Sequence, residues 1–373
     1  MRPLIPWWSN CLAPYCIGLE HSIGQYNVSM GKVVSDFESQ LASYYNSDYA
    51  CCFSSGTAAL SAALVALRKS SADSIYLPNR TWIGTANAAA YMGHPISLYD
   101  SLKGHQNGDP SDLERAIHSS KTTAKEQEHS IVIWVPVNGS FAGLEEIISV
   151  CKAYRLPLLV DACQSFASNK NAILRLLESG ALVAFSFGMP KIISTGLGGC
   201  ILGNLSRVED RLRSVRNQGI SEASGLVDQA YGFNLKYTDI QAFIGLQQLL
   251  DLDNIISRHK SAISIYSDIL RLPFVEGSHL ACLAEDEIPL RAEIYMKDPI
   301  RFQGYMKACG IEVSLRTDNI SSHPLYQSID HSNLVNSLAY CNSIVVLPSG
   351  PGQRCQDLEY VRDCLLLYNH EQI

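Results

Sequence analysis

Two charged side chains stand at the ends of apolar segments near the middle of the chain. Asp161 closes the run PLLV, and Lys191 follows the run LVAFSFGMP. In a parallel sheet the C-terminal ends of the strands share one edge, and α/β folds bind their ligands there. A carboxylate and a lysine at such an edge suit pyridoxal phosphate, which takes a lysine on its aldehyde carbon and a carboxylate at its ring nitrogen. The two residues therefore predict a site for this cofactor.

A turn of small residues is a candidate site for the phosphate of that cofactor. The short apolar segment ACCF ends at Ser54-Ser55-Gly56-Thr57, and an Ala- and Leu-rich helix follows directly. The first backbone N–H groups of a helix have no partner within the helix, and they bind anions. We therefore expect this turn to hold the phosphate.

Apolar segments that alternate with helical segments are expected to position these residues. The strand candidates are ACCF, SIYLP, IVIWVPV, PLLVDA, LVAFSFG and GGCILG. Apolar strands without interleaved polar residues, separated by helices, are typical of a mostly parallel sheet covered on both faces. The sequence thus predicts an α/β fold for the first two-thirds of the chain.

Two capping-box patterns mark expected helix starts. Ser35 and Glu38 would open the helix SDFESQLASYYN, and Thr238 and Gln241 would open a long helix at the predicted domain hinge. Shorter strand and helix signals follow that hinge. We therefore expect a large domain with an N-terminal arm at 1–251 and a small α+β domain at 252–373.

Composition and charge exclude several classes of protein. The chain has 373 residues, 47% of them hydrophobic, and a formal net charge of -7, which excludes a disordered chain and a basic surface for nucleic acid or anionic membrane. Its apolar stretches are shorter than the ~18–20 residues that span a bilayer, and its N-terminus does not resemble a signal peptide. Twelve cysteines without a CxxC pair, together with dispersed histidines, argue against a metal site. We expect a cytoplasmic protein with reduced thiols and without metal.

The order and spacing of the motifs resemble the DegT/DnrJ/EryC1/StrS family of pyridoxal-phosphate aminotransferases. Many members of that family aminate keto groups of nucleotide-linked sugars. The matching stretches are GKVVSDFESQLASYY, SSGTAALSAAL, LPNRTWIGTANAAAYMG, VDACQSF, FSFGMPK, TGLGG, RNQGI, GFNLKYTDIQAFIGLQQL and IVVLPSGPG. The resemblance implies the aspartate-aminotransferase-like fold type I.

Four residues near the cofactor ring receive roles from this resemblance. Lys191 would hold the cofactor as a Schiff base and shuttle a proton, and Asp161 would keep the ring nitrogen protonated. Gln164 would donate its amide to the phenolic oxygen, and Trp82 would lie over the ring face. From its sequence context alone, Trp82 is equally compatible with a core aromatic residue.

The phosphate ligands are implied in the same way. The backbone amides of Gly56, Thr57 and Ala58 would bind the phosphate at the helix N-terminus, and the Ser186 hydroxyl would add a further contact. Asn234 would reach the phosphate of a neighbouring subunit, so that a homodimer would share its active sites. Asn beside Gly is also ordinary turn chemistry, which is the alternative for Asn234.

The implied reaction moves an amino group from an amino acid, glutamate or glutamine by family analogy, to a keto sugar in amino-sugar or natural-product biosynthesis. A related dehydratase branch has histidine in place of the lysine, so Lys191 indicates a transaminase. Phe166 stands where many relatives have histidine, Leu197 where glutamate is common, and Asn138–Leu144 lacks a family aspartate. We expect these departures around the substrate pocket. Two alternatives therefore stay open: an aminotransferase for a non-sugar cyclic ketone, and a binding module without turnover, which the retained Lys191 and Asp161 disfavour.

Overall fold

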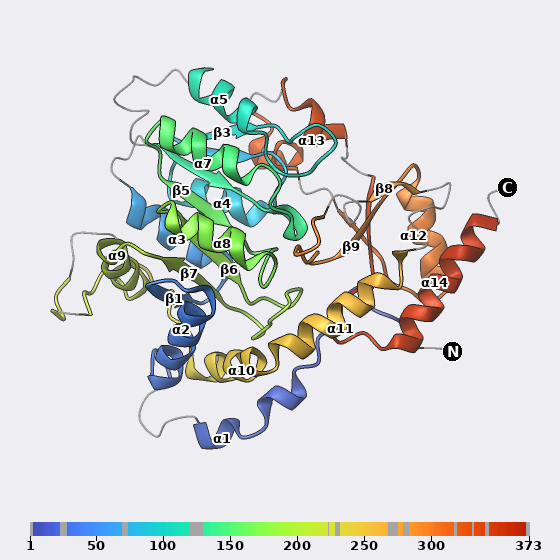
Figure 1. Ribbon diagram of the computed structural model, residues 1–373, viewed down its shortest axis with the longest axis horizontal. Helices are drawn as coiled ribbons and strands as arrows, with labels where there is room; N and C mark the ends of the chain where they lie inside the picture. Colours follow the sequence, from blue (N-terminus) through green and yellow to red (C-terminus); the bar gives the residue numbers. More distant parts are fainter. Residues whose placement is uncertain are drawn as a thin grey trace.

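The computed structural model describes residues 3–22, 28–68, 74–119, 130–222, 224–227, 232–267, 275–278, 283–316, 319–329, 332–339 and 343–370. Within these residues the chain forms a seven-stranded sheet and a four-stranded sheet, each covered by helices (Figure 1). The fold is α/β, with a mostly parallel first sheet, as the sequence predicts.

The first sheet has the strand order β1-β7-β6-β5-β4-β2-β3. All neighbours pair in parallel except β7, which lies antiparallel between β1 and β6. The strands are β1 (Tyr49–Phe53), β2 (Ile75–Pro78), β3 (Ile96–Tyr99), β4 (Ile131–Trp134), β5 (Leu158–Asp161), β6 (Leu182–Ser186) and β7 (Gly199–Gly203).

Helices cover both faces of this sheet, and successive strand residues alternate between two cores. Cys51 belongs to one core and Cys52 to the other, because adjacent side chains of a strand point to opposite faces. One face carries α3 (Gly56–Leu67), α4 (Ile83–Tyr91) and α9 (Ser206–Arg216). The other carries α2 (Lys32–Tyr45), α5 (Pro110–Ser119), α7 (Leu144–Ala153), α8 (Lys170–Glu178) and α10 (Asp239–Leu250).

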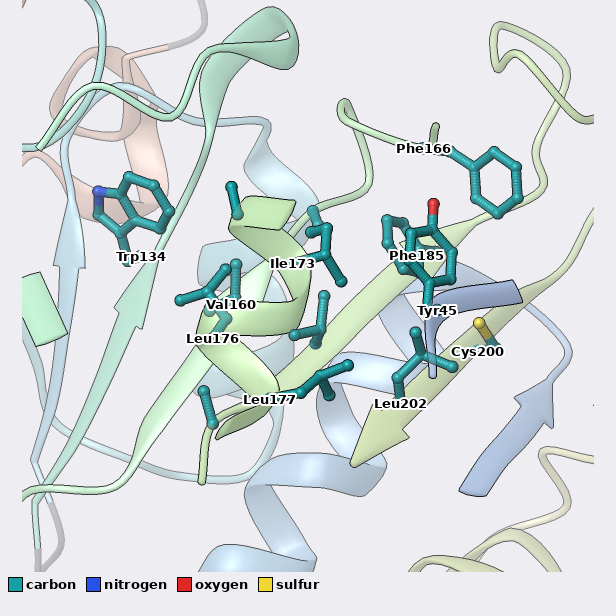
Figure 2. Close-up of a cluster of buried hydrophobic side chains, with 14 of the residues drawn as sticks. Tyr45, Trp134, Val160, Phe166, Ile173, Leu176, Leu177, Phe185, Cys200 and Leu202 are labelled. Atoms are coloured by element: carbon teal, nitrogen blue, oxygen red, sulfur yellow. The ribbon is translucent and has the colours of Figure 1, made fainter. Parts of the chain in front are cut away.

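The second core includes an aromatic cluster beside α8. Figure 2 shows Ile173, Leu176 and Leu177 of α8 grouped with strand side chains such as Val160, and Tyr45 beside Phe185. The rings of Tyr45 and Phe185 stack with centroids 5.0 Å apart. Full burial of such side chains is the main stabilising contribution to the sheet that carries the site.

The four-stranded sheet has the order β10-β11-β9-β8 and is antiparallel throughout. It is formed by β8 (Val275–Ser278), β9 (Ala292–Met296), β10 (Ser314–Arg316) and β11 (Ile344–Leu347), and is accompanied by α12 (Pro299–Ala308), α13 (Val335–Ala339) and α14 (Cys355–His370). Its core is a separate cluster packed with side chains of α12 and α14. The chain reaches it through α11 (Leu252–Ser264), which contributes Leu252 to the core of the first sheet and Ala262 to that of the second.

The two predicted capping boxes have different outcomes. The Thr238 box is confirmed: Thr238 and Gln241 bond reciprocally at the start of α10, although the predicted long helix is divided at Asp251. The Ser35 box is wrong, because α2 begins at Lys32 after Gly31. Glu38 instead accepts a hydrogen bond from the Cys52 amide at 2.7 Å, so this buried carboxylate joins the helix to β1.

Candidate active site

The turns after four strands meet at one edge of the first sheet. β5 ends at Asp161, β6 ends at Ser186, β1 leads into α3 at Gly56, and β2 leads into the segment that carries Trp82. β2 pairs in parallel with β4, β4 with β5, and β5 with β6, so these strands all run the same way. β1 also runs this way, because β7 is antiparallel to both β1 and β6. The C-terminal ends of these strands therefore share the edge where α/β folds bind ligands.

Asp161 is buried and held by two donors. Thr85 Oγ1 donates to Asp161 Oδ2 at 2.6 Å, and the Cys163 amide donates to Oδ1 at 3.2 Å. Thr85 is itself 2.8 Å from the hydroxyl of Thr81. The carboxylate is thus fixed in orientation and can still accept from a ligand through its remaining lone pairs. Sequence reasoning missed Thr85, although the two threonines of TWIGT directly after a strand were the available signal.

Gly56 lies where the first turn of α3 meets the end of β6. A Cβ added to Gly56 would lie 2.8 Å from Ser186 Cβ and 3.0 Å from Cys163 Sγ, so this approach requires glycine. Ser55 caps the helix by accepting from the Ala58 amide at 3.0 Å. The cap therefore uses the amide of Ala58, and the amides of Gly56 and Thr57 are those best placed for an anion.

Cys163 connects this turn with both charged residues. Burial and the Asp161 carboxylate raise the pKa of the Cys163 thiol well above its usual range, and the charge of Lys191 opposes that rise. The Cys163 sulfur lies close to Gly56, since a Cβ built there would be 3.0 Å from it. Since a raised pKa keeps the thiol protonated, Cys163 is a poor nucleophile.

Gln164 is buried beside Asp161 and is bonded at one end of its amide. Its Oε1 accepts from the Asn138 amide at 3.1 Å and from Arg291 Nη2 at 3.1 Å. Arg291 is a further site residue that sequence reasoning missed. Its signal was a pair of charges, Arg291 and Glu293, in the otherwise apolar segment PLRAEIYM.

Two predicted residues lie at the surface of the single chain. Trp82 is 54% exposed, which is inconsistent with a core aromatic residue. A Cβ built on Gly84 would lie 3.0 Å from Trp82 Cδ1 and 2.9 Å from Thr57 Oγ1, so both side chains border the start of α4. Asn234 is exposed in a segment that bridges to Asn217. The roles of Trp82 over a ring and of Asn234 toward a neighbouring subunit stay predictions.

The expected departures from the family pattern do not all surround a pocket. Phe166 is 4% exposed and packs edge-on against Tyr45 and Phe185 in the core (Figure 2), so its expected place near the substrate was wrong. Leu197 is 64% exposed in the glycine turn. Asn138 is fully buried and bonds to the backbone of Arg291.

No group of three or more metal-ligating side chains is found among the described residues. Among the same residues, no helix is long and apolar enough to cross a membrane.

Comparison with curated proteins gives relatives in amino-sugar synthesis. The sequence is 31% identical to GDP-perosamine synthase of Escherichia coli O157:H7 over 238 residues, which cover 64% of this chain and 63% of that protein. The chain thus spans less than two thirds of the length of this relative.

Solved structures share the fold over nearly the whole chain. The crystal structure of S. venezuelae DesV in complex with a ketimine intermediate matches with a TM-score of 0.85 and 20% identity, covering 99% of both chains. NtdA from Bacillus subtilis, solved with bound cofactor PMP, matches with a TM-score of 0.83 and 19% identity over 99% of this chain and 85% of that chain. The fold is therefore the α/β fold type I that the sequence predicts.

The strongest assignment comes from the whole-chain pattern. The sequence model of one aminotransferase family matches residues 19–366. That region includes the Gly56 turn, Asp161, Ser186 and Lys191. The chain belongs to the DegT/DnrJ/EryC1/StrS aminotransferase family.

Proposed function

We propose that this protein is a pyridoxal-phosphate-dependent aminotransferase. One observation carries the proposal: a Cβ built on Gly56, at the start of α3, would lie 2.8 Å from Ser186 Cβ at the end of β6 and 3.0 Å from the sulfur of Cys163, two residues after Asp161. The start of α3 and the ends of β5 and β6 therefore lie together, and Lys191 follows the end of β6 by five residues. An amine, a carboxylate and a helix N-terminus are the three groups that this cofactor requires.

The residues present fit the cofactor in their chemistry. When bound, pyridoxal phosphate supplies an aldehyde for an amine and a ring that withdraws electrons from the carbon that gains or loses nitrogen. The amides of Gly56 and Thr57 and the hydroxyl of Ser186 would bind its phosphate, because the glycine lets the helix start approach the strand end. The Ala58 amide is a weaker candidate, since Ser55 Oγ already accepts from it.

Asp161 would hold a proton on the ring nitrogen. A buried carboxylate favours the protonated, positively charged form of a neighbouring base, and Thr85 keeps that carboxylate in place. Lys191 would move a proton between the substrate carbon and the C4′ carbon of the cofactor, which lie on either side of the transferred nitrogen. Trp82 would cover one face of the ring and exclude water from it, and Gln164 would donate to the phenolic oxygen.

We propose a nucleotide-linked keto sugar as the acceptor and glutamate or glutamine as the amino donor. Family membership and the similarity to a GDP-perosamine synthase support a sugar acceptor. The departures at Asn138–Leu144 and Leu197 leave Lys191, Asp161 and Ser186 in the sequence, so the reaction type is better supported than the identity of the acceptor.

We also propose a cytoplasmic homodimer that shares its active sites. Three large apolar side chains in the segments that follow β2 and β6 are exposed on the single chain, namely Trp82, Met189 and Leu197, and a second subunit would cover them. Asn234 is exposed, and a residue that reaches the active site of a second subunit has to be exposed on the single chain. Ten cysteines of the described residues carry free thiols, which is typical of a reducing compartment.

The proposal is tested by loading the purified protein with pyridoxal phosphate, reducing it with borohydride and mapping the labelled peptide by mass. We expect the label on Lys191, none in Lys191→Ala, and wild-type labelling in the surface control Lys152→Ala. In a separate sample that has not been reduced, glutamate should convert the visible band to the aminated form, and a panel of nucleotide-linked keto sugars and cyclic ketones should restore it. Absence of label on Lys191 in a folded protein contradicts the proposal.

A further inference from the structure

The orientation of the Gln164 amide is determined by its two neighbours. Both are donors, a backbone N–H of Asn138 and a guanidinium N–H of Arg291, each 3.1 Å from Gln164 Oε1. Only the carbonyl end of an amide accepts hydrogen bonds, so Oε1 must face them. The Nε2 end consequently lies on the side away from Arg291.

Arg291 is held in place by an ion pair with Glu293. Its Nε lies 2.8 Å and its Nη2 2.6 Å from Oε1 of Glu293, and both side chains are buried. Glu293 in turn accepts from Gln106 Nε2 at 3.3 Å. The charges of the pair balance each other, and the arginine keeps one N–H for Gln164.

The backbone of Arg291 is fixed to the same loop as Gln164. Its N–H donates to Asn138 Oδ1 at 2.8 Å, and its carbonyl accepts from Asn138 Nδ2 at 3.0 Å. Asn138 thus binds Arg291 through its side chain and Gln164 through its backbone. Contacts from distant parts of the chain therefore determine the orientation of the Gln164 side-chain amide.

A buried ion pair of this kind adds little to stability, since an apolar pair of similar volume often serves as well. A reason for its presence is that it fixes the Arg291 guanidinium, which in turn fixes the orientation of the Gln164 amide. We propose that Arg291 is a positioning residue, which holds Gln164 in the one orientation that lets Nε2 donate to the phenolic oxygen of pyridoxal phosphate. This inference rests on the proposed function, and it adds a residue from the β9 region to the cofactor site.

The proposal predicts a spectroscopic effect. An N–H donor draws negative charge from the phenolic oxygen and weakens that oxygen's hold on a neighbouring proton. Loss of the donor should therefore move the pH midpoint of the visible band of the bound cofactor to higher pH, by about one pH unit.

The test is a pH titration of the visible band in matched variants. Arg291→Met combined with Glu293→Gln removes the donor without leaving a buried carboxylate unpaired. It should shift the midpoint in the same direction as Gln164→Ala, and adding it to Gln164→Ala should produce no further shift. Arg291→Lys is a milder second variant, because its single ammonium pairs with Glu293; it should shift the midpoint while largely keeping the Tm.

Phe302→Leu is the control for a loss of stability alone. Phe302 is fully buried in the core of the second sheet, so this change should lower the Tm and leave the midpoint at the wild-type value. The inference is overturned if Gln164→Ala shifts the midpoint and neither Arg291 variant does, or if the two shifts add in full. A wild-type protein that shows no visible band with added cofactor contradicts the proposed function instead.

Discussion

Gly56→Ala is expected to damage both stability and cofactor binding. The new Cβ would lie 2.8 Å from Ser186 Cβ and 3.0 Å from Cys163 Sγ, closer than carbon and sulfur atoms pack. The closer contact is to a Cβ at the end of β6, which no side-chain rotation can move away. We expect a loss of about 1–3 kcal/mol in the free energy of unfolding, as for other overpacked sites.

The same displacement should weaken phosphate binding. Moving the start of α3 away from β6 separates the Gly56 and Thr57 amides from the Ser186 hydroxyl. Loss of one hydrogen bond to a charged phosphate is worth about 1.5 kcal/mol, which corresponds to roughly a tenfold rise in the Kd for pyridoxal phosphate.

Urea unfolding of the cofactor-free protein and a fluorescence titration with pyridoxal phosphate measure the two effects separately. Gly304→Ala in α12 is the matched control, because its Cβ meets no atom within 4 Å and alanine favours a helix. Gly56→Ala/Ser186→Gly should recover part of the stability without recovering affinity, since it removes the closer of the two contacts together with the hydroxyl. Unchanged stability and unchanged Kd in Gly56→Ala would refute the account of this turn.

Three further predictions follow from other parts of the structure. Thr85→Val removes the donor to Asp161 Oδ2, so it should lower the free energy of unfolding by about 1–3 kcal/mol and weaken cofactor binding. Thr85→Ser keeps the hydroxyl and should preserve both stability and affinity. Equal behaviour of the two variants in urea unfolding argues against this bond. Burial lowers the pKa of His259 to about 4, below the 6.5 of the unfolded chain, so the unfolded state binds the proton and stability is lost as the pH falls from 6.5 to 4. We expect a loss of about 2 kcal/mol between pH 6.5 and 5 that His259→Asn reduces, measured by urea unfolding at both pH values; an equal loss in the variant contradicts the assignment. Mixing inactive Lys191→Ala with inactive Asn234→Asp subunits should restore about a quarter of wild-type activity, because half of the dimers then hold one intact site; no recovery after proven subunit exchange excludes a shared site.

The strands of the first sheet were predictable because each is a short apolar run followed by small or polar residues. The outcome at β7 shows the limit: GGCILG predicts a strand, but not that it runs antiparallel between β1 and β6. Strand direction depends on how the connection crosses the sheet, which local periodicity does not encode.

The candidate site was predictable where a single side chain defines a role in a local motif. Asp161, Ser186 and Gly56 each follow or end a strand, so their place at one edge follows from topology. Thr85, Asn138 and Arg291 were missed because their roles depend on partners far along the chain, such as the bond between Gln164 and Arg291. The false Ser35 box has a similar cause, since the buried contacts of Glu38 with Cys52 and Arg216 replace a local cap.

A crystal structure of the protein grown with pyridoxal phosphate tests the central claim most directly. The account predicts one cofactor at the C-terminal edge of the first sheet, with its ring nitrogen within hydrogen-bond distance of an Asp161 oxygen and its 4′ carbon joined to Lys191 Nζ. Its phosphate should contact the amides of Gly56 and Thr57. A cofactor bound elsewhere, or a ring that reaches only one of Lys191 and Asp161, contradicts it.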